Sequence, residues 1–231
     1  MPVTELILLP LNPAASEADV ASAIEANTKV LLSQGALRVR RSPVLENSSQ
    51  LRMFVDWEDL AQHAAFAAND AVYGPFRARM GPLVDFASPD FAPPYHAAFA
   101  AYPPPGLDVG APGTRAGVAE LTHAYFPADV GDAERAEAER TVERFAADLK
   151  EVAEGFTGEL ALGWSVEDDI QFEGQPSRVL VGVLGWESLE AHKKASETEG
   201  FAKVMPALMN LERLRGMKMC HVQCITTERE S

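Results

Sequence analysis

Cysteine is almost missing from this sequence, which has two cysteines among its 231 residues. Cys220 and Cys224 lie four residues apart on an expected strand, which places them about 13 Å from each other. A disulfide needs Cα atoms within about 7 Å, so we expect two free thiols. Free thiols are typical of a reducing compartment, and the sequence therefore predicts a cytoplasmic protein.

Long apolar runs and a basic surface are lacking as well. No stretch approaches the roughly 20 apolar residues that a membrane span needs, and residues 1–6 lack the basic residue with which a signal peptide begins. The formal net charge is −14, whereas nucleic acids and anionic membranes bind positive surfaces. We expect neither as a partner. The hydrophobic fraction of 47% predicts packed cores instead.

Several motifs with known chemistry are also absent. The sequence has no glycine-rich phosphate loop and no nucleophile elbow around a serine. No two histidines have metal-ligand spacing along the chain, and Cys220 and His221 point to opposite faces of one expected strand. We therefore expect no cofactor and no metal.

What the sequence does contain is an internal repeat. Residues 57–63, WEDLAQH, return at 186–192 as WESLEAH. The match extends to residues 4–6 against 119–121, to 35–37 against 158–160, and to expected final strands that carry His96 and His221. A repeat of this size predicts two similar units. We place the first at 1–102 and the second at 118–231, joined by a proline- and glycine-rich linker at 103–117.

Each unit is predicted to have the order β-α-β-β-α-β. The expected strands are 3–11, 36–45, 51–55, 95–102, 118–126, 158–166, 177–184 and 217–226, and the expected helical regions are 16–33, 57–86, 132–155 and 188–211. Residues 179–184 are apolar at nearly every position, so both faces of that strand should be buried. Since helices cover one face of such a sheet, we expect the two sheets to pack face to face in a barrel-like sandwich.

The repeat and the segment 186–192, which leads into a broken helix, resemble the dimeric α/β-barrel superfamily. They look most like its antibiotic biosynthesis monooxygenase (ABM) branch, with two copies fused in tandem. The resemblance implies an α+β fold of two ferredoxin-like units forming an intrachain pseudo-dimeric α/β barrel. The superfamily includes cofactor-free quinone-forming oxygenases, haem-degrading enzymes, polyketide cyclases of secondary metabolism, isomerases and members without a known reaction.

The second unit carries the candidate site that we infer from its strands. The catalytic candidates are His123, His221 and Tyr125, and the substrate-binding candidates are Trp164, Met217, Met219, Gln223 and His96. The last strand of such a unit lies beside its first, so His123 and His221 should converge among methionine thioethers suited to a planar phenol. A histidine there could deprotonate a phenol near neutral pH. The alternative is two core histidines bonded to each other or to the backbone.

The first unit has Leu8 where the second has His123. We therefore expect its pocket to be decayed, or to use other residues such as Tyr95 and Tyr102.

The repeated tryptophans and helix histidines have simpler explanations. Trp57 and Trp186 are expected to be buried anchors with one N–H to satisfy. His63 and His192 are expected to be partly exposed helix histidines or capping contacts. Haem-degrading relatives use an Asn–Trp–His set, and neither first strand of this sequence contains an asparagine.

One charge contrast distinguishes the two hairpins. The first carries Arg38, Arg40 and Arg41, and the second carries Glu167, Asp168 and Asp169. We expect solvated faces, with complementary arms that meet each other as the alternative.

The sequence thus predicts a cofactor-independent enzyme that oxygenates or cyclises an aromatic or polyketide-like substrate, with a histidine as base. The alternative is a non-catalytic ligand-binding or stress-response protein of the same fold, and the third hypothesis is haem binding. The expected partner is a small hydrophobic or aromatic ligand, and the expected state is a pseudo-dimeric monomer or a homodimer.

Overall fold

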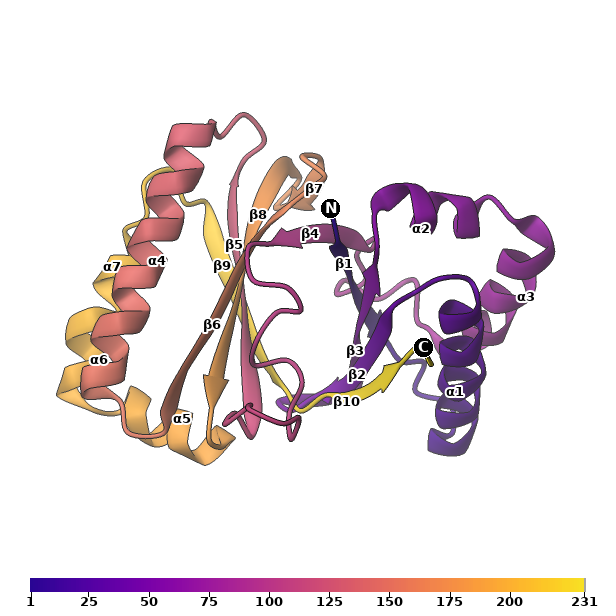
Figure 1. The fold of residues 1–231 in the computed structure, drawn as a ribbon, viewed down its shortest axis with the longest axis horizontal. Helices are drawn as coiled ribbons and strands as arrows, with labels where there is room; N and C mark the ends of the chain where they lie inside the picture. Colours follow the sequence, from indigo (N-terminus) through magenta and orange to yellow (C-terminus); the bar gives the residue numbers. More distant parts are fainter. Residues whose placement is uncertain (231) are drawn as a thin grey trace. The chain divides into compact units, whose positions relative to one another are not determined.

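The computed structural model describes residues 1–230, which divide into two compact units (Figure 1). The first contains Met1–Ala98 and residues 225–230, and the second contains Phe99–Cys224. Each unit combines antiparallel strands with helices, so the expected α+β class is confirmed. Within residues 1–230, no helix combines the length and the apolar character needed to span a membrane.

The first unit is an antiparallel sheet with helices on one face (Figure 1). Its elements are β1 (Val3–Pro10), α1 (Glu17–Ser33), β2 (Arg38–Val44), β3 (Asn47–Trp57), α2 (Leu60–Ala67), α3 (Asp70–Met80), the short 3-10 helix η1 (Gly81–Leu83), β4 (Tyr95–Phe99) and β10 (Ile225–Glu228). The strand order is β10-β2-β3-β1-β4. Without β10, this is the order of a ferredoxin-like β-α-β-β-α-β unit.

The second unit has the same strand order, β6-β8-β5-β9, with its helices on one face (Figure 1). Its elements are β5 (Val118–Pro127), α4 (Asp132–Val152), β6 (Phe156–Ser165), β7 (Ile170–Phe172), β8 (Gln175–Trp186), α5 (Leu189–Ser196), α6 (Glu199–Val204), α7 (Pro206–Met209) and β9 (Gly216–Val222). The short strand β7 pairs with β8 as a hairpin.

Helix α4 illustrates how the sequence sets an element. Glu134 begins the helix by accepting a hydrogen bond from the Gly131 backbone N–H at 2.7 Å. The sequence has an apolar stripe at Val142, Phe145, Leu149 and Val152, of which the first three are buried and Val152 is 38% exposed. Gly155 follows the helix with φ +86°, a left-handed conformation that suits glycine and stops the helix.

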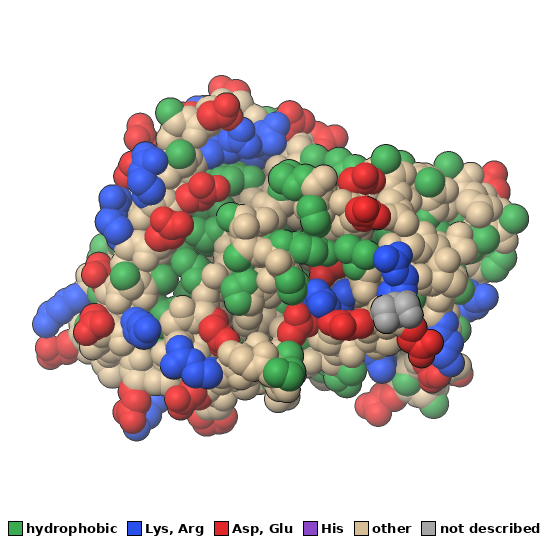
Figure 2. All heavy atoms as spheres, in the orientation of Figure 1, with side chains coloured by type: hydrophobic (Ala, Val, Ile, Leu, Met, Phe, Trp, Pro, Cys, Tyr) green, Lys and Arg blue, Asp and Glu red, His purple; other side chains and the backbone are tan. Residues whose placement is uncertain are grey.

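The outer face of α4 is charged. Figure 2 shows acidic and basic side chains intermingled over this helix. Glu137 pairs with Arg140 at 2.8 Å and with Arg144 at 3.0 Å, and all three side chains are at least half exposed. This surface is therefore a solvated helix face.

The expected linker 103–117 has no regular structure, but it is packed into the second unit. Leu107 is fully buried. The backbone N–H groups of Arg115 and Ala116 donate to the Glu159 carboxylate at 3.0 and 2.9 Å. An apolar anchor and a carboxylate that satisfies the backbone hold this segment in place.

The strand expected at 217–226 is two strands in the structure. β9 ends at Val222 and pairs with β5, whereas β10 pairs with β2, with Ile225 opposite Arg41 and Glu228 opposite Arg38. Alternation along a sequence does not reveal a change of partner strand, so the single-strand prediction was wrong.

The solvated face expected for the first hairpin was wrong for Arg40, whose side chain has no exposed surface. Its guanidinium donates to Asp56 at 2.9 Å, and Asp56 is also fully buried. Arg38 reaches the same carboxylate at 3.3 Å. In the second hairpin, Asp168 pairs with Arg178 at 3.2 Å near the surface.

Candidate functional site

Each unit holds a set of four residues of the same types on corresponding elements. The first set is Glu5, Trp57, His63 and His96, and the second set is Glu120, Trp186, His192 and His221. In the two sets the glutamate lies on β1 or β5, and the tryptophan is the last residue of β3 or β8. One histidine lies on the helix that follows, α2 or α5, and the other lies on β4 or β9.

Strand pairing brings each glutamate to a histidine. Glu5 on β1 is directly opposite His96 on β4, and Glu120 on β5 is directly opposite His221 on β9. Opposite residues of an antiparallel pair have Cβ atoms about 5 Å apart on the same face. The first and last strands therefore place these side chains together.

A helix cap brings in the remaining histidine. Asp59 caps α2 by accepting a hydrogen bond from a backbone N–H three residues further on, at 2.9 Å. Ser188 caps α5 in the same way at 3.0 Å. Each cap follows the tryptophan by two residues, so the first helical turn carries His63 or His192 back over the sheet.

The first set forms a chain of polar contacts. The Trp57 indole donates to Glu5 Oε2 at 3.2 Å, and His63 Nε2 lies 3.7 Å from the same oxygen. His63 Nδ1 is 2.8 Å from His96 Nε2. A tryptophan thus holds a carboxylate beside one imidazole, which is hydrogen-bonded to a second.

The second set repeats this pattern atom for atom. The Trp186 indole donates to Glu120 Oε2 at 2.8 Å, and His192 Nε2 lies 3.7 Å from that oxygen. His192 Nδ1 is 2.6 Å from His221 Nε2. Because two separate segments of chain reach the same arrangement, we attribute it to the shared topology.

A carboxylate and two imidazoles could also hold a metal ion. Two imidazole nitrogens bound to one tetrahedral zinc lie about 3.3 Å apart, given Zn–N distances of about 2.0–2.1 Å. The distances of 2.8 and 2.6 Å are shorter and match hydrogen bonds. We therefore interpret both sets as hydrogen-bonded groups, in which the position of each imidazole proton depends on the tautomer.

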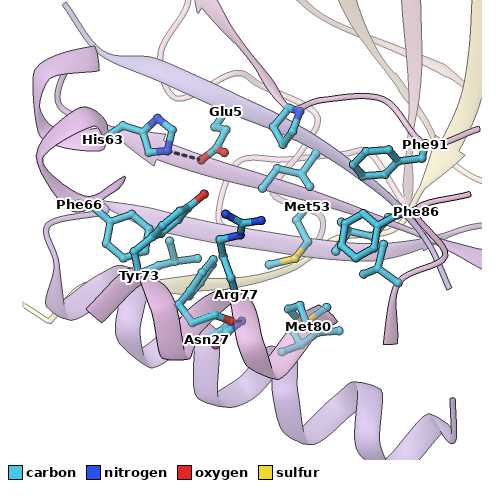
Figure 3. Close-up of a pocket in the computed structure, with 17 residues that line it drawn as sticks. Glu5, Asn27, Met53, His63, Phe66, Tyr73, Arg77, Met80, Phe86 and Phe91 are labelled. Atoms are coloured by element: carbon cyan, nitrogen blue, oxygen red, sulfur yellow. Dashed lines mark hydrogen bonds and ion pairs between the residues drawn. The ribbon is translucent and has the colours of Figure 1, made fainter. Parts of the chain in front are cut away.

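Access to the two sets differs. A cavity of about 270 Å³ in the first unit has Glu5 and His63 in its wall, as Figure 3 shows. The His63 side chain is 20% exposed, against 8% for His192. The second unit has a cavity of about 210 Å³ between α4 and residues 210–212 and one of about 10 Å³ beneath α4, and no residue of the second set lines either of them. The first set thus opens onto a space of ligand size.

Helix α3 forms one wall of the large cavity. None of its residues is fully buried, so it stands off the sheet. Asn27 of α1 connects the two helices, because it donates to the Phe76 carbonyl oxygen and accepts from Arg79, both at 3.0 Å. The aromatic and thioether side chains in the lining are Phe66, Tyr73, Phe76, Phe86, Phe91, Met53 and Met80.

The predicted convergence of His123 with His221 was wrong. His221 is opposite Glu120, whereas His123 is opposite Lys218. Glu120 and His123 are three positions apart on β5, so their side chains point to opposite faces of the sheet. His123 shares its face with Tyr125, whose ring stacks on Phe172 with centroids 4.2 Å apart.

The substrate-binding candidates of the second unit are dispersed. Trp164 packs in the core beside Phe126, with ring centroids 5.1 Å apart. Met217 lines the small cavity beneath α4, Met219 is 55% exposed, and Gln223 is exposed between β9 and β10. None of them lines the 270 Å³ cavity.

The remaining substrate-binding candidate, His96, belongs to the first set, in the unit whose pocket was expected to be decayed. That unit instead contains the large cavity. Neither Tyr95 nor Tyr102 is in its lining.

Sequence reasoning missed the glutamates as site residues and treated the helix histidines as peripheral. A usable signal was present, because the repeat aligns Glu5 with Glu120 and His63 with His192. A glutamate at a repeated position of an otherwise apolar strand needs a buried partner. The tryptophan and the histidines supply it.

Neither a protein-family model nor a curated protein matches this chain. Solved structures match over almost its whole length. A structure described as an anthrone oxidase-like protein has a TM-score of 0.62 and 14% identity, covering 100% of this chain and 94% of the other. A candidate monooxygenase from Fusobacterium nucleatum has a TM-score of 0.60 and 13% identity, covering 100% and 95%.

A chlorite dismutase from Candidatus Nitrospira defluvii, solved with imidazole, has a TM-score of 0.51 and 13% identity, covering 96% of this chain and 90% of the other. At these identities the likeness shows a shared fold.

Proposed function

We propose that this protein is an enzyme that binds a planar phenolic or polyketide-like substrate in the first-unit cavity and oxygenates it without a cofactor. The observation that carries this proposal is the junction of the first set with the 270 Å³ cavity. Sites for small molecules are concave and mostly apolar, with a few polar groups that converge. This cavity has that composition.

The cavity size suits a small aromatic compound. A cavity of about 150 Å³ binds benzene, so 270 Å³ accommodates about two fused rings. Haem has roughly seven times as many heavy atoms as benzene, which is far more than this volume holds. We therefore derive no haem chemistry at this cavity, and haem binding is not our proposal.

The first set is suited to removing a proton. Glu5 stabilises positive charge on the neighbouring His63, whose second nitrogen is hydrogen-bonded to His96. A phenol placed against these groups can transfer its proton to them and become an electron-rich phenolate. Dioxygen can then convert the ring CH para to the phenolate oxygen into a carbonyl, with one oxygen atom retained in the resulting quinone and the other leaving as water. The substrate supplies all the electrons.

The test compares matched variants of the two sets. Turnover of a naphthol and a dihydroxynaphthalene, both with two fused rings, is measured in air for Glu5→Gln and His63→Gln, with Glu120→Gln and His192→Gln as controls. General-base catalysis contributes about 10²–10⁴-fold, so each first-set variant is expected to lose at least a hundredfold in kcat/KM. The second-set variants should keep most activity, with melting temperatures matched across the four proteins.

Four results would refute the proposal. Equal losses from both sets would show that access to the cavity is irrelevant. Turnover that continues without oxygen would favour cyclisation, and no turnover with ligand bound would favour a non-catalytic binding protein. If EDTA abolishes activity and a divalent ion restores it, the first set is a metal site and not a hydrogen-bonded base.

We also propose that the two units form an intrachain pseudo-dimeric α/β barrel, as two tandem copies of one ancestral unit. The sequence repeat and the common strand order support the duplication. The strand at 179–184 is apolar on both faces, and this pattern calls for cover on the sheet face that its own helices leave open.

A further inference from the structure

We propose that the substrate of the first-unit cavity is an aromatic hydroxy acid, whose hydroxyl group lies at Glu5 and His63 and whose carboxylate is bound by Arg77. This inference deepens the proposed function and rests on it. It is carried by an arginine in the cavity wall that the protein itself does not neutralise.

Arg77 lies in the last turns of α3, and Figure 3 shows its side chain reaching into the cavity between Tyr73 and Met53. Its guanidinium carbon is 5.8 Å from the centroid of the Tyr73 ring. Among residues 1–230, no hydrogen bond or ion pair to this guanidinium is formed.

The neighbouring Arg79 shows the contrast. Its guanidinium donates to Asn27 Oδ1 at 3.0 Å, and Asn27 also holds the Phe76 carbonyl group. Arg79 therefore fastens α3 to α1. Arg77, half a turn earlier, is an exposed residue that lies over the Tyr73 ring, and its guanidinium N–H groups are available to a ligand.

The charges of the cavity also fix how a ligand would lie. Glu5 is a carboxylate that already accepts from Trp57, so it repels a second carboxylate and favours a hydroxyl donor. A guanidinium binds a carboxylate through two parallel N–H donors. A ligand with a hydroxyl at one end and a carboxylate at the other satisfies both groups.

The rest of the lining fits the aromatic part of such a ligand. The Phe66 ring meets Tyr73 and Phe76 edge-on, with centroids 5.3 and 5.2 Å away. Offset and edge-on contacts of this kind are favourable for a further aromatic ring. With room for about two fused rings, the class is that of hydroxynaphthoic acids.

The experiment measures equilibrium binding of three kinds of probe to the full chain without oxygen, so that binding is separated from turnover. The probes are a naphthol, a naphthoic acid and hydroxynaphthoic acids with the two groups on the same ring or on opposite rings. We expect at least one hydroxynaphthoic acid to bind about tenfold more tightly than the naphthol, the equivalent of one charge-assisted contact.

Arg77→Gln should lower the ratio of hydroxynaphthoic-acid affinity to naphthol affinity from about ten to about one. The control is Lys29→Gln, which removes the same charge from an exposed position on α1, outside the cavity lining, and should keep the preference. Arg77→Lys should keep part of it, because lysine retains the charge without the fork geometry.

The inference is overturned if no probe binds, if the naphthol binds as tightly as every hydroxy acid, or if Arg77→Gln keeps the preference. These results differ from failure of the proposed function. If hydroxy acids bind through Arg77 but are not oxidised, the proposed enzymatic function fails and the proposed binding site stands. If a naphthol is oxidised and a carboxylate gives no gain in affinity, the enzymatic function stands and the carboxylate site at Arg77 fails.

Discussion

Replacing Asp56 by alanine is expected to destabilise the first unit by about 3–5 kcal/mol, the cost of removing one partner from a buried ion pair. Asp56 is fully buried next to Trp57, on the sheet face that the helices do not cover. Its carboxylate accepts from Thr4 at 2.8 Å, Arg40 at 2.9 Å and Arg38 at 3.3 Å.

The magnitude follows from how each partner is placed. Arg38 also pairs with Glu228, and its side chain is partly exposed. Removing the Asp56 carboxylate therefore costs Arg38 little of its stabilisation. Arg40 is fully buried, and its charge would lose a carboxylate that it cannot replace with bulk water. The matched control is Glu25→Ala, which removes an exposed pair with Lys29 and should leave the stability nearly unchanged.

Hydrogen–deuterium exchange of the β2 and β3 amides measures this loss within the first unit. A change of 3 kcal/mol corresponds to more than a hundredfold faster exchange. In Asp56→Asn, an amide oxygen at the same place can still accept from Thr4 or Arg40, so exchange should be slower than in Asp56→Ala. The reasoning fails if Asp56→Ala exchanges like the wild type, or if Asp56→Asn is no better than Asp56→Ala.

Two further predictions concern the second unit. The pKa of Glu134 lies below its usual 4.5, first because the Gly131 N–H donates to its carboxylate and then because Arg213 does. The stabilisation from this cap is therefore complete above the unfolded-state pKa and disappears as pH falls through the folded-state pKa. Glu134→Gln should lower the melting temperature at neutral pH and much less in acid, and an equal deficit at both would contradict the cap. Residues 106–231 expressed alone should be unstable or self-associate in analytical ultracentrifugation, because the fragment leaves an apolar sheet face uncovered, and a well-folded monomer would count against the pseudo-dimer.

Local patterns in the sequence predicted most of the fold. The stripe Val142, Phe145, Leu149 and Val152 and the stop at Gly155 identified α4, although Val152 is exposed, and strand alternation with a repeat predicted the order of both units. Such signals depend on neighbouring residues and on the helix or strand period. The break between β9 and β10 depends on which distant strand is adjacent, and no local period encodes that choice.

Strand register explains why the site was missed. The prediction placed His123 beside His221, whereas the true register pairs Glu120 with His221. A shift by one residue moves every side chain to the other face of a sheet. The composition of β5 fits both alternatives, since Leu121, His123 and Tyr125 on one face and Glu120 on the other are all buried. The repeated glutamate contained the missing information.

The two sets have the same geometry but differ in their access to a cavity. The second set has the same donors and acceptors as the first, with histidine pairs at 2.6 and 2.8 Å, yet His192 is nearly enclosed. Hydrogen bonding within the set therefore serves the fold in both units, and each copy should contribute similarly to stability. What distinguishes the first copy is α3, which stands off the sheet and leaves His63 facing a cavity. Since the strands fix the set and the helices fix its access, a difference in activity between Glu5→Gln and Glu120→Gln at equal stability isolates the chemical role from the structural one.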